Sequence, residues 1–195
     1  MSKGDETKVA ILDEALQIAS RVGFNALSIG GLAERTEMSK GGLFAHFRSK
    51  EALQLQTLEH SRTRFIDQVI RPTLNAPRGV RRLRELFARW LDWETSALDG
   101  GCIFITASAE YDSQPGAMRD ALVRNQEDWL DTIATVADTA VAEGEFRPDV
   151  DTRQLAFELH GLMLGFHHSG RLLEDPLALD RTRTAFESML DARLA

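Results

Sequence analysis

The sequence predicts an all-α protein of about nine helices, with a three-helix N-terminal head followed by a larger helical body. Two observations lead to this fold class. Apolar residues recur at the i, i+3, i+4 spacing of an amphipathic helix through most of the chain. Helix-capping residues, glycines and prolines separate these stretches, and no segment shows a convincing strand pattern.

The first helix is predicted over residues 7–22, because apolar residues line one face of this stretch and Gly23 can end it. A second, short helix should begin after Ser28, whose hydroxyl can cap it, and end near Thr36. Its apolar positions are Ile29, Leu32 and Ala33. A third helix should follow Ser39, which can cap it in the same way, and Leu43 and Phe47 would pack against the second helix.

The remaining helices form the body. Ser49 can cap a long helix that Pro72 and Pro77 end or bend, Gly100 and Gly101 interrupt the chain, and Gly144 ends the longest segment. The predicted body helices cover about residues 51–71, 80–98, 103–112, 115–143, 152–173 and 176–194.

Charge is distributed unevenly along the 195 residues. The net charge is −7, yet residues 1–55 contain seven Lys/Arg and seven Asp/Glu, so the body carries the whole excess. A neutral head on an acidic body can be oriented toward DNA, but it predicts modest non-specific affinity, because neutralisation of phosphates supplies most of the free energy of non-specific binding.

No apolar run has membrane-spanning length and the N-terminus has no signal-peptide pattern, so we expect a cytoplasmic protein without a membrane partner.

The second and third helices, joined by a tight turn, have the outline of a helix-turn-helix, whose second helix enters the major groove of DNA. Lys40 and Lys50 lie in first helical turns, where contact with phosphate is favoured. The glycines would let the backbone approach a groove closely. The candidate contacts to double-stranded DNA are Ser28, Ser39, Lys40, Gly41, Gly42, Phe44, His46 and Lys50.

The segment SKGGLFAHFRSKEAL closely resembles the recognition-helix region of the TetR/AcrR family of transcriptional regulators, in the order Ser39-Lys40-Gly41, Phe44, His46-Phe47 and Ser49-Lys50-Glu51. The likeness extends back through ILDEALQIASRVGFNALSIGGLA and covers about residues 7–55.

The chain differs from the family pattern in three places. The family usually has Tyr where this chain has Phe44, so a hydrogen bond from a phenol is missing. The family often has Gly near the position of Glu37. Two glycines, Gly30 and Gly31, should weaken the second helix.

This resemblance implies a DNA-binding domain over residues 1–50 and a ligand-binding and dimerisation domain over residues 51–195. It implies a mostly apolar effector pocket in the body, for which the candidates are Trp90, Trp93, Phe104, Glu110, Tyr111, Trp129, Phe166 and His167. It also implies a homodimer formed by the last two helices, for which the candidates are Leu159, Leu162, Met163, Phe166, Leu179, Phe186 and Leu190. Two-fold symmetry would then predict a pseudo-palindromic operator.

Other chemistries find little support in the sequence. His160 and His167 share a helix face but would be about 10.5 Å apart along its axis, too far to hold one metal ion. The single Cys102 cannot form an intrachain disulfide and is expected to be a small buried hydrophobe. Nucleophile-elbow, P-loop and dinucleotide motifs are absent, so we expect no enzyme, no metal and no cofactor.

Two function classes remain. The first is a dimeric, ligand-responsive regulator, expected to be a repressor, which a small effector releases from its operator by shifting the helix that begins after Ser49. The second is a helical small-molecule binding protein or enzyme whose DNA-binding head is vestigial. Specific binding to DNA would separate the two.

Overall fold

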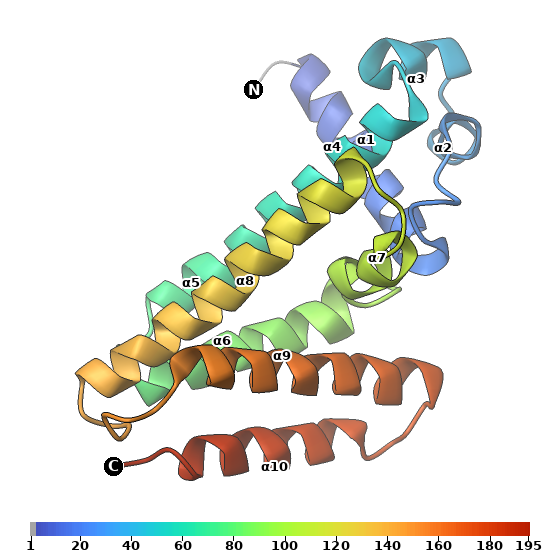
Figure 1. Cartoon of the computed structure of the whole chain (residues 1–195). Helices are drawn as coiled ribbons and strands as arrows, with labels where there is room; N and C mark the ends of the chain where they lie inside the picture. The colour runs from blue at the N-terminus through green and yellow to red at the C-terminus, as the bar shows by residue number, and fades with distance from the viewer. Residues whose placement is uncertain (1–2) are drawn as a thin grey trace. The chain divides into compact units, whose positions relative to one another are not determined.

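The computed structural model describes residues 3–195, with side chains from Gly4 onward, and these residues form nine continuous helical segments (Figure 1). The all-α class and the number of helices are therefore confirmed. The elements are α1 (Lys3–Val22), α2 (Ile29–Thr36), α3 (Lys40–Phe47), α4 (Lys50–Phe65), η1 (Ile66–Ile70), α5 (Arg71–Leu74), α6 (Val80–Asp92), η2 (Trp93–Ala97), α7 (Ile103–Tyr111), α8 (Ala117–Ala142), α9 (Thr152–His167), η3 (His168–Leu172) and α10 (Ala178–Asp191).

Three of the segments contain a π-helical turn, namely η1, η2 and η3. The turn η1 lies directly before α5, in which Pro72 occupies the first helical turn. Proline lacks the backbone N–H and its ring clashes with the carbonyl four residues earlier, and a widened turn accommodates both effects. The long helix therefore continues past Pro72 to Leu74, a few residues beyond the expected end near Arg71. The last helix begins at Ala178 rather than at Pro176.

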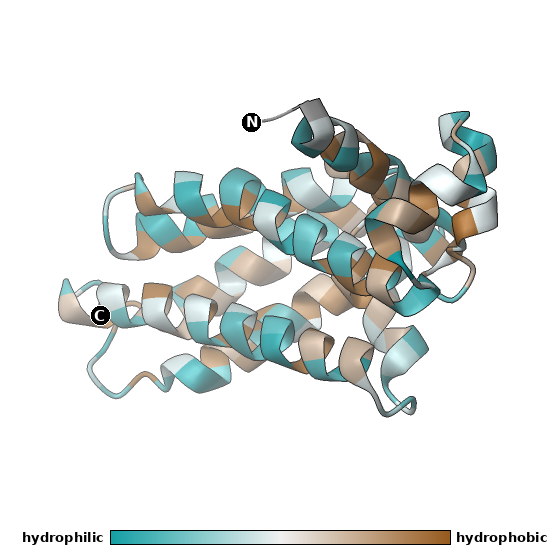
Figure 2. Ribbon diagram, turned by 90° about the horizontal axis from the view of Figure 1, so that it is seen from above, coloured by the Kyte–Doolittle hydropathy of each residue, from teal (hydrophilic) through white to brown (hydrophobic). Residues whose placement is uncertain are grey.

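The contacts divide the chain into two compact units. Unit 1 comprises the residues up to Ile66 together with Thr95–Arg124, and unit 2 comprises Asp67–Glu94 together with Asn125–Ala195. Thus α7, which the sequence places in the body, packs in the same unit as α1 to α4. Figure 2 shows hydrophobic and hydrophilic residues interspersed along the helices of both units, a composition typical of helices that bury one face.

The core of unit 1 forms where α1 packs against α2, α4 and α7. Leu16, Phe24 and Leu53 are completely buried there. The end of α1 lies against the turn before α7: Gly100 N–H donates to Ser20 Oγ over 3.3 Å, and Arg21 forms an ion pair with Asp99. The approach is so close that a Cβ on Gly100 would lie 1.6 Å from the Ser20 carbonyl oxygen.

Unit 2 is built around aromatic side chains of α6, α9 and α10. The rings of Phe87 and Phe186 stack with centroids 4.0 Å apart, and Trp90 meets Phe166 edge to face at 6.0 Å. Helices α9 and α10 form an antiparallel pair (Figure 1). Arg193 bridges them by donating to Glu158 over 2.6 Å; hydrogen bonds from Gln154 and then from Arg193 lower the pKa of that carboxyl.

Substituting Gly100 tests the docking of α1 on the turn before α7. Gly100→Ala should destabilise the protein by at least about 2 kcal/mol, because the added methyl collides with backbone atoms that cannot move independently. Urea unfolding followed by circular dichroism measures the change. The matched control is Gly41→Ala on α3, where a Cβ meets no atom within 4 Å and helix propensity should raise stability by up to about 1 kcal/mol. Equal stability of the two variants would contradict the close contact.

Candidate functional site

The serines at the start of α2, α3 and α4 cap these helices. Ser28 Oγ accepts from Gly31 N–H and Ser39 Oγ accepts from Gly42 N–H, each over 3.1 Å, and Ser49 Oγ accepts from Ala52 N–H over 3.0 Å. These bonds satisfy backbone donors that the first helical turn would otherwise leave unpaired. Ser28 and Ser39 are both predicted DNA contacts, and each hydroxyl keeps its own proton to donate because capping uses it only as an acceptor.

The turn between α2 and α3 depends on Glu37. This residue adopts the left-handed conformation, with φ 55° and ψ 24°, and its N–H closes α2 on the carbonyl of Ala33. Left-handed backbone costs an ordinary residue about 1–2 kcal/mol, so the turn is made at the expense of stability. The next N–H, that of Met38, also donates to Ala33, over 3.2 Å.

Helix α3 has one buried side and one exposed side. Leu43 and Phe47 are buried, as the helical spacing predicts, and α3 packs against both α2 and α4. Lys40, Gly41 and Ala45 are exposed, and Phe44 is 53% exposed although it is a large apolar residue. Gly42 and His46 are half-buried. The exposed and half-buried residues include five of the eight predicted DNA contacts, so the helix presents most of the expected set to solvent.

The connection between α1 and α2 is held by four hydrogen bonds to its backbone. Glu110 of α7 accepts from the N–H groups of Phe24 over 3.1 Å and Asn25 over 2.9 Å. The buried Gln54 donates to the carbonyl of Phe24 over 2.6 Å, and Lys50 Nζ donates to the carbonyl of Asn25 over 2.5 Å. We call these four bonds the α1–α2 clamp. Lys50, predicted to contact phosphate, therefore uses one of its three protons inside the protein.

The predicted effector-pocket residues fall in both units. Phe104, Glu110 and Tyr111 belong to unit 1, where Glu110 forms the clamp just described. Burial, and then the charge of Glu110, raises the pKa of the Tyr111 hydroxyl. The other candidates belong to unit 2, where they are buried or half-buried: Trp90, Trp93, Trp129, Phe166 and His167.

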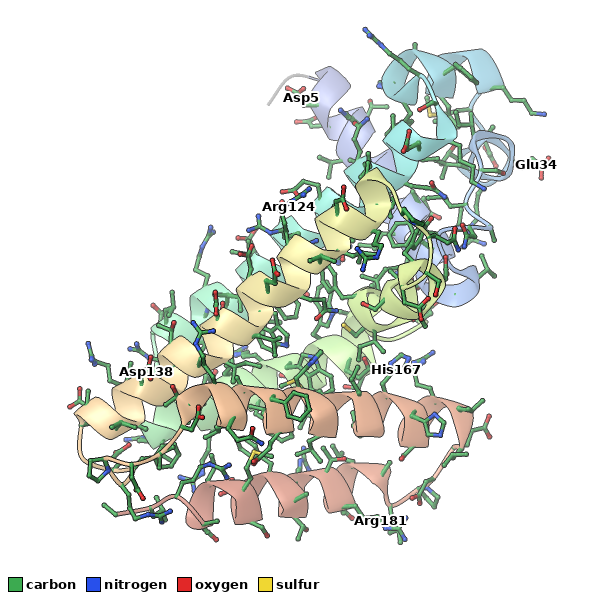
Figure 3. All side chains as sticks on the ribbon, in the orientation of Figure 1. Asp5, Glu34, Arg124, Asp138, His167 and Arg181 are labelled. Carbon is green, nitrogen blue, oxygen red and sulfur yellow. The ribbon has the colours of Figure 1, made fainter. Side chains whose placement is uncertain are left out.

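One polar residue of unit 2 was missed by the sequence reasoning. Glu94 is only 2% exposed, and its carboxylate lies 2.8 Å from Nδ1 of His167, which Figure 3 labels near the end of α9. Glu94 lies in η2, and His167 directly precedes η3. The spacing contained a signal, because Glu94 continues the apolar stripe of Leu83, Phe87 and Trp90 by one more helical turn. A carboxylate at such a position is buried and requires a partner.

The residues predicted for the dimer interface are mostly internal to unit 2. Leu159, Met163, Phe166, Phe186 and Leu190 are each no more than 7% exposed in the single chain, because α9 and α10 pack them against each other and against α6. Leu162 and Leu179 are half-buried. Five of the seven expected residues therefore lie on the core side of these two helices, and the solvent side also carries other residues.

The solvent side of α9 is apolar between Phe157 and Gly165. Phe157 is 70% exposed and Leu164 is 41% exposed. Gly161 and Gly165 are exposed on the same side, and a Cβ on either would meet no atom within 4 Å. We call Phe157, Gly161, Leu164 and Gly165 the outer α9 face. Large exposed apolar side chains beside small ones are typical of surfaces that pack against another helix.

Within residues 3–195, the structure brings no three His, Cys, Asp or Glu residues together in a way that could hold a metal ion. A search of the same residues for a helix long and apolar enough to span a bilayer finds none.

Two family models match the chain. The model described as "Bacterial regulatory proteins, tetR family" matches residues 11–57, which include α2, the turn and α3. The model described as "Tetracyclin repressor-like, C-terminal domain" matches residues 79–186, more than half of the chain.

Individual relatives agree with these models. The HTH-type transcriptional repressor DhaR from Mycobacterium sp. strain GP1 is 26% identical over 150 residues, which span 75% of this chain and 73% of that protein. The crystal structure of a TetR transcriptional regulator from Chloroflexus aurantiacus superposes with a TM-score of 0.90, at 26% identity and with both chains fully covered. A TetR-family regulator from Cytophaga hutchinsonii has the same fold, with a TM-score of 0.86, 20% identity, and 100% and 98% of the two chains covered.

The strained turn can be tested directly. Glu37→Gly should stabilise the protein by about 1 kcal/mol, because glycine adopts the left-handed conformation without the Cβ clash. Glu37→Gln is the matched control, since it removes the same charge but keeps the strain. Thermal unfolding of both variants measures the difference. If the glutamine variant gains as much stability as the glycine variant, charge rather than backbone conformation limits the turn.

Proposed function

We propose that this chain, which belongs to the tetR family of bacterial regulatory proteins, is a ligand-responsive repressor that binds a pseudo-palindromic operator as a homodimer. The observation that carries the proposal is the geometry of α2, the Glu37 turn and α3. The two short helices are each capped by a serine, and α3 exposes most of the residues expected to face DNA. This is the arrangement in which a second helix enters a major groove.

The proposed contacts to DNA combine phosphate positioning with a close backbone approach. Lys40 is exposed in the first turn of α3, where the helix dipole favours phosphate. Gly41 faces open space, so it does not obstruct the approach of α3 to the groove. Ser28 and Ser39 would donate their hydroxyl protons to phosphate, and Lys50 would offer the protons that the α1–α2 clamp leaves free. His46 and Phe44 complete the surface.

We propose that the dimer forms through the outer α9 face together with α10. The exposed ring of Phe157 and the side chain of Leu164 would pack against the partner, and Gly161 and Gly165 would let the two helices approach closely. The core residues of α9 and α10 would support this face without taking part in it. Two heads related by a two-fold axis would read half-sites whose centres are about 34–36 Å apart, or a multiple of this spacing.

We propose that a small, mostly apolar effector binds in the body and releases the operator. The support within unit 2 is the group of buried aromatic residues near Glu94 and His167, which lie at two π-helical turns. Such turns are frequent at functional sites. Helix α6 follows α5 in the chain, and α5 continues back through η1 into α4 without a break. A shift at η2 would therefore pass along the chain to α4. Operator and effector would then disfavour each other's binding.

Binding to DNA tests the central proposal. The full-length protein should enrich a particular sequence from a pool of random duplexes, and the selected duplex should then be bound more tightly than random DNA. Lys40→Ala should weaken binding and lower the slope of log K against log salt by about one, because one phosphate contact is lost. Fluorescence anisotropy at several salt concentrations measures both quantities.

The matched control is Lys8→Ala on α1, which removes the same charge at a position outside α2 and α3 and should leave the slope nearly unchanged. Equal binding to selected and random duplexes would contradict a sequence-specific regulator. A slope that falls equally in both variants would contradict the assignment of Lys40 to a phosphate.

The oligomeric state tests the dimer face. Leu164→Glu should shift the protein toward monomer, because it places two charges in the centre of the outer α9 faces that meet. Leu74→Glu on α5 is the matched control, since Leu74 is also exposed, at 54%, but lies on another helix. Sedimentation velocity at micromolar concentration measures the outcome. A Leu164→Glu variant with the sedimentation coefficient of the parent would exclude this face.

A further inference from the structure

We propose that Phe44 selects thymine in the operator by packing against its C5-methyl group, so that part of the sequence reading by α3 is apolar rather than hydrogen-bonded. This inference rests on the proposed function, because it assumes that α3 lies in a major groove. It names a specificity-determining residue and the base that this residue recognises.

Between Gly41 and Ala45, the exposed side of α3 contains no side chain that forms hydrogen bonds with bases. Gly41 and Ala45 lie one helical turn apart and are both exposed, on the side opposite to the buried Leu43 and Phe47. Phe44 flanks them and is 53% exposed. The centre of the surface that would face the groove is therefore formed by a hydrogen atom, a methyl group and a phenyl ring.

The polar side chains of α3 lie away from this centre. Lys40 begins the helix, where it is suited to phosphate. His46 is half-buried, with its ring centroid 6.1 Å from that of the buried Phe47. Ser39, before the helix, already accepts a hydrogen bond from Gly42 N–H. Arg and Asn, whose side chains form the common two-point contacts with guanine and adenine, do not occur between Lys40 and Phe47.

The chemistry of the groove then restricts what this surface can recognise. Each base pair presents hydrogen-bond donors and acceptors in the major groove, and the only apolar group among them is the methyl of thymine. Packing a phenyl ring on that methyl removes apolar area from water, whereas packing it on a cytosine amino group would bury a donor without a partner. The small residues Gly41 and Ala45 let the backbone of α3 come close enough to the groove for this contact. Gly41 faces open space in the free protein, since a Cβ there would meet no atom within 4 Å.

The experiment replaces thymine by uracil, which lacks only the methyl group. The full-length protein is first used to select its site from random duplexes. Each thymine of the selected duplex is then replaced singly by deoxyuridine, and the dissociation constants are measured by anisotropy. We expect one or two positions in each half-site at which the loss of the methyl weakens binding by about fourfold, the factor that corresponds to one buried methyl-sized group.

Variants of Phe44 identify the residue that makes the contact. Phe44→Ala should weaken binding to the thymine duplex and should no longer distinguish thymine from uracil at those positions. Phe44→Tyr is the matched control, since it keeps the ring and should keep the discrimination. Phe44 is exposed, so both variants should unfold at nearly the parent temperature, which circular dichroism checks.

The outcomes separate this inference from the proposed function. A protein that enriches no sequence overturns both. A protein that enriches a sequence but binds its uracil versions equally well at every position overturns only the inference. Discrimination against uracil that persists in Phe44→Ala also overturns it, because another residue would then read the methyl.

Discussion

The α1–α2 clamp is the constraint on which the DNA-binding head depends. A connection of a few residues between two helices exposes backbone groups that must find partners when they are partly buried. Here, Glu110, Gln54 and Lys50 supply those partners for both N–H and both C=O groups of Phe24 and Asn25. The clamp fixes where α2 begins, and the Glu37 turn then fixes where α3 lies. Because Glu110 belongs to α7, a movement of α7 must either carry this connection with it or break two hydrogen bonds to a carboxylate. Such bonds are among the stronger ones in proteins.

The sequence determines most of the head by local rules, and the structure follows it there. Ser28, Ser39 and Ser49 cap the helices that they were expected to cap, and Leu43 and Phe47 are buried because their spacing matches a helix face. The role of Glu110 could not be predicted in this way, because its partners lie more than 80 residues earlier in the chain. Periodicity shows that a residue lies on one face of a helix, but it does not show which element packs against that face.

The same limit explains why most residues of α9 that were expected at a dimer interface are buried within the single chain. The helix has apolar residues on two sides, and periodicity alone does not say which side the protein covers with its own chain. Leu159 and Met163 pack inside unit 2, whereas Phe157 and Leu164 remain exposed. Glu94 is the converse case. A charged residue in line with Phe87 and Trp90 is easily assigned to the surface, yet the fold buries it and supplies His167 as its partner. A buried carboxylate of this kind costs stability when it loses its partner, so the pair holds η2 and the end of α9 in register.

The head is electrically neutral, and this affects how a regulator of this kind can work. If α3 enters a groove as proposed, a head without net charge would have modest non-specific affinity, so discrimination would come from the close fit of α3. A fit based on small side chains and one aromatic ring is sensitive to position, since a gap of about 1 Å removes up to about half of the attraction between apolar atoms. In the proposed dimer, a small displacement of the two heads would then weaken binding to both half-sites of an operator at once. An effector that favours the displaced arrangement by about 3 kcal/mol would shift the equilibrium by more than a hundredfold, which is within the usual range of coupling between two sites. Weak electrostatic attachment and a geometry-dependent fit would therefore make the proposed release by a small ligand energetically accessible.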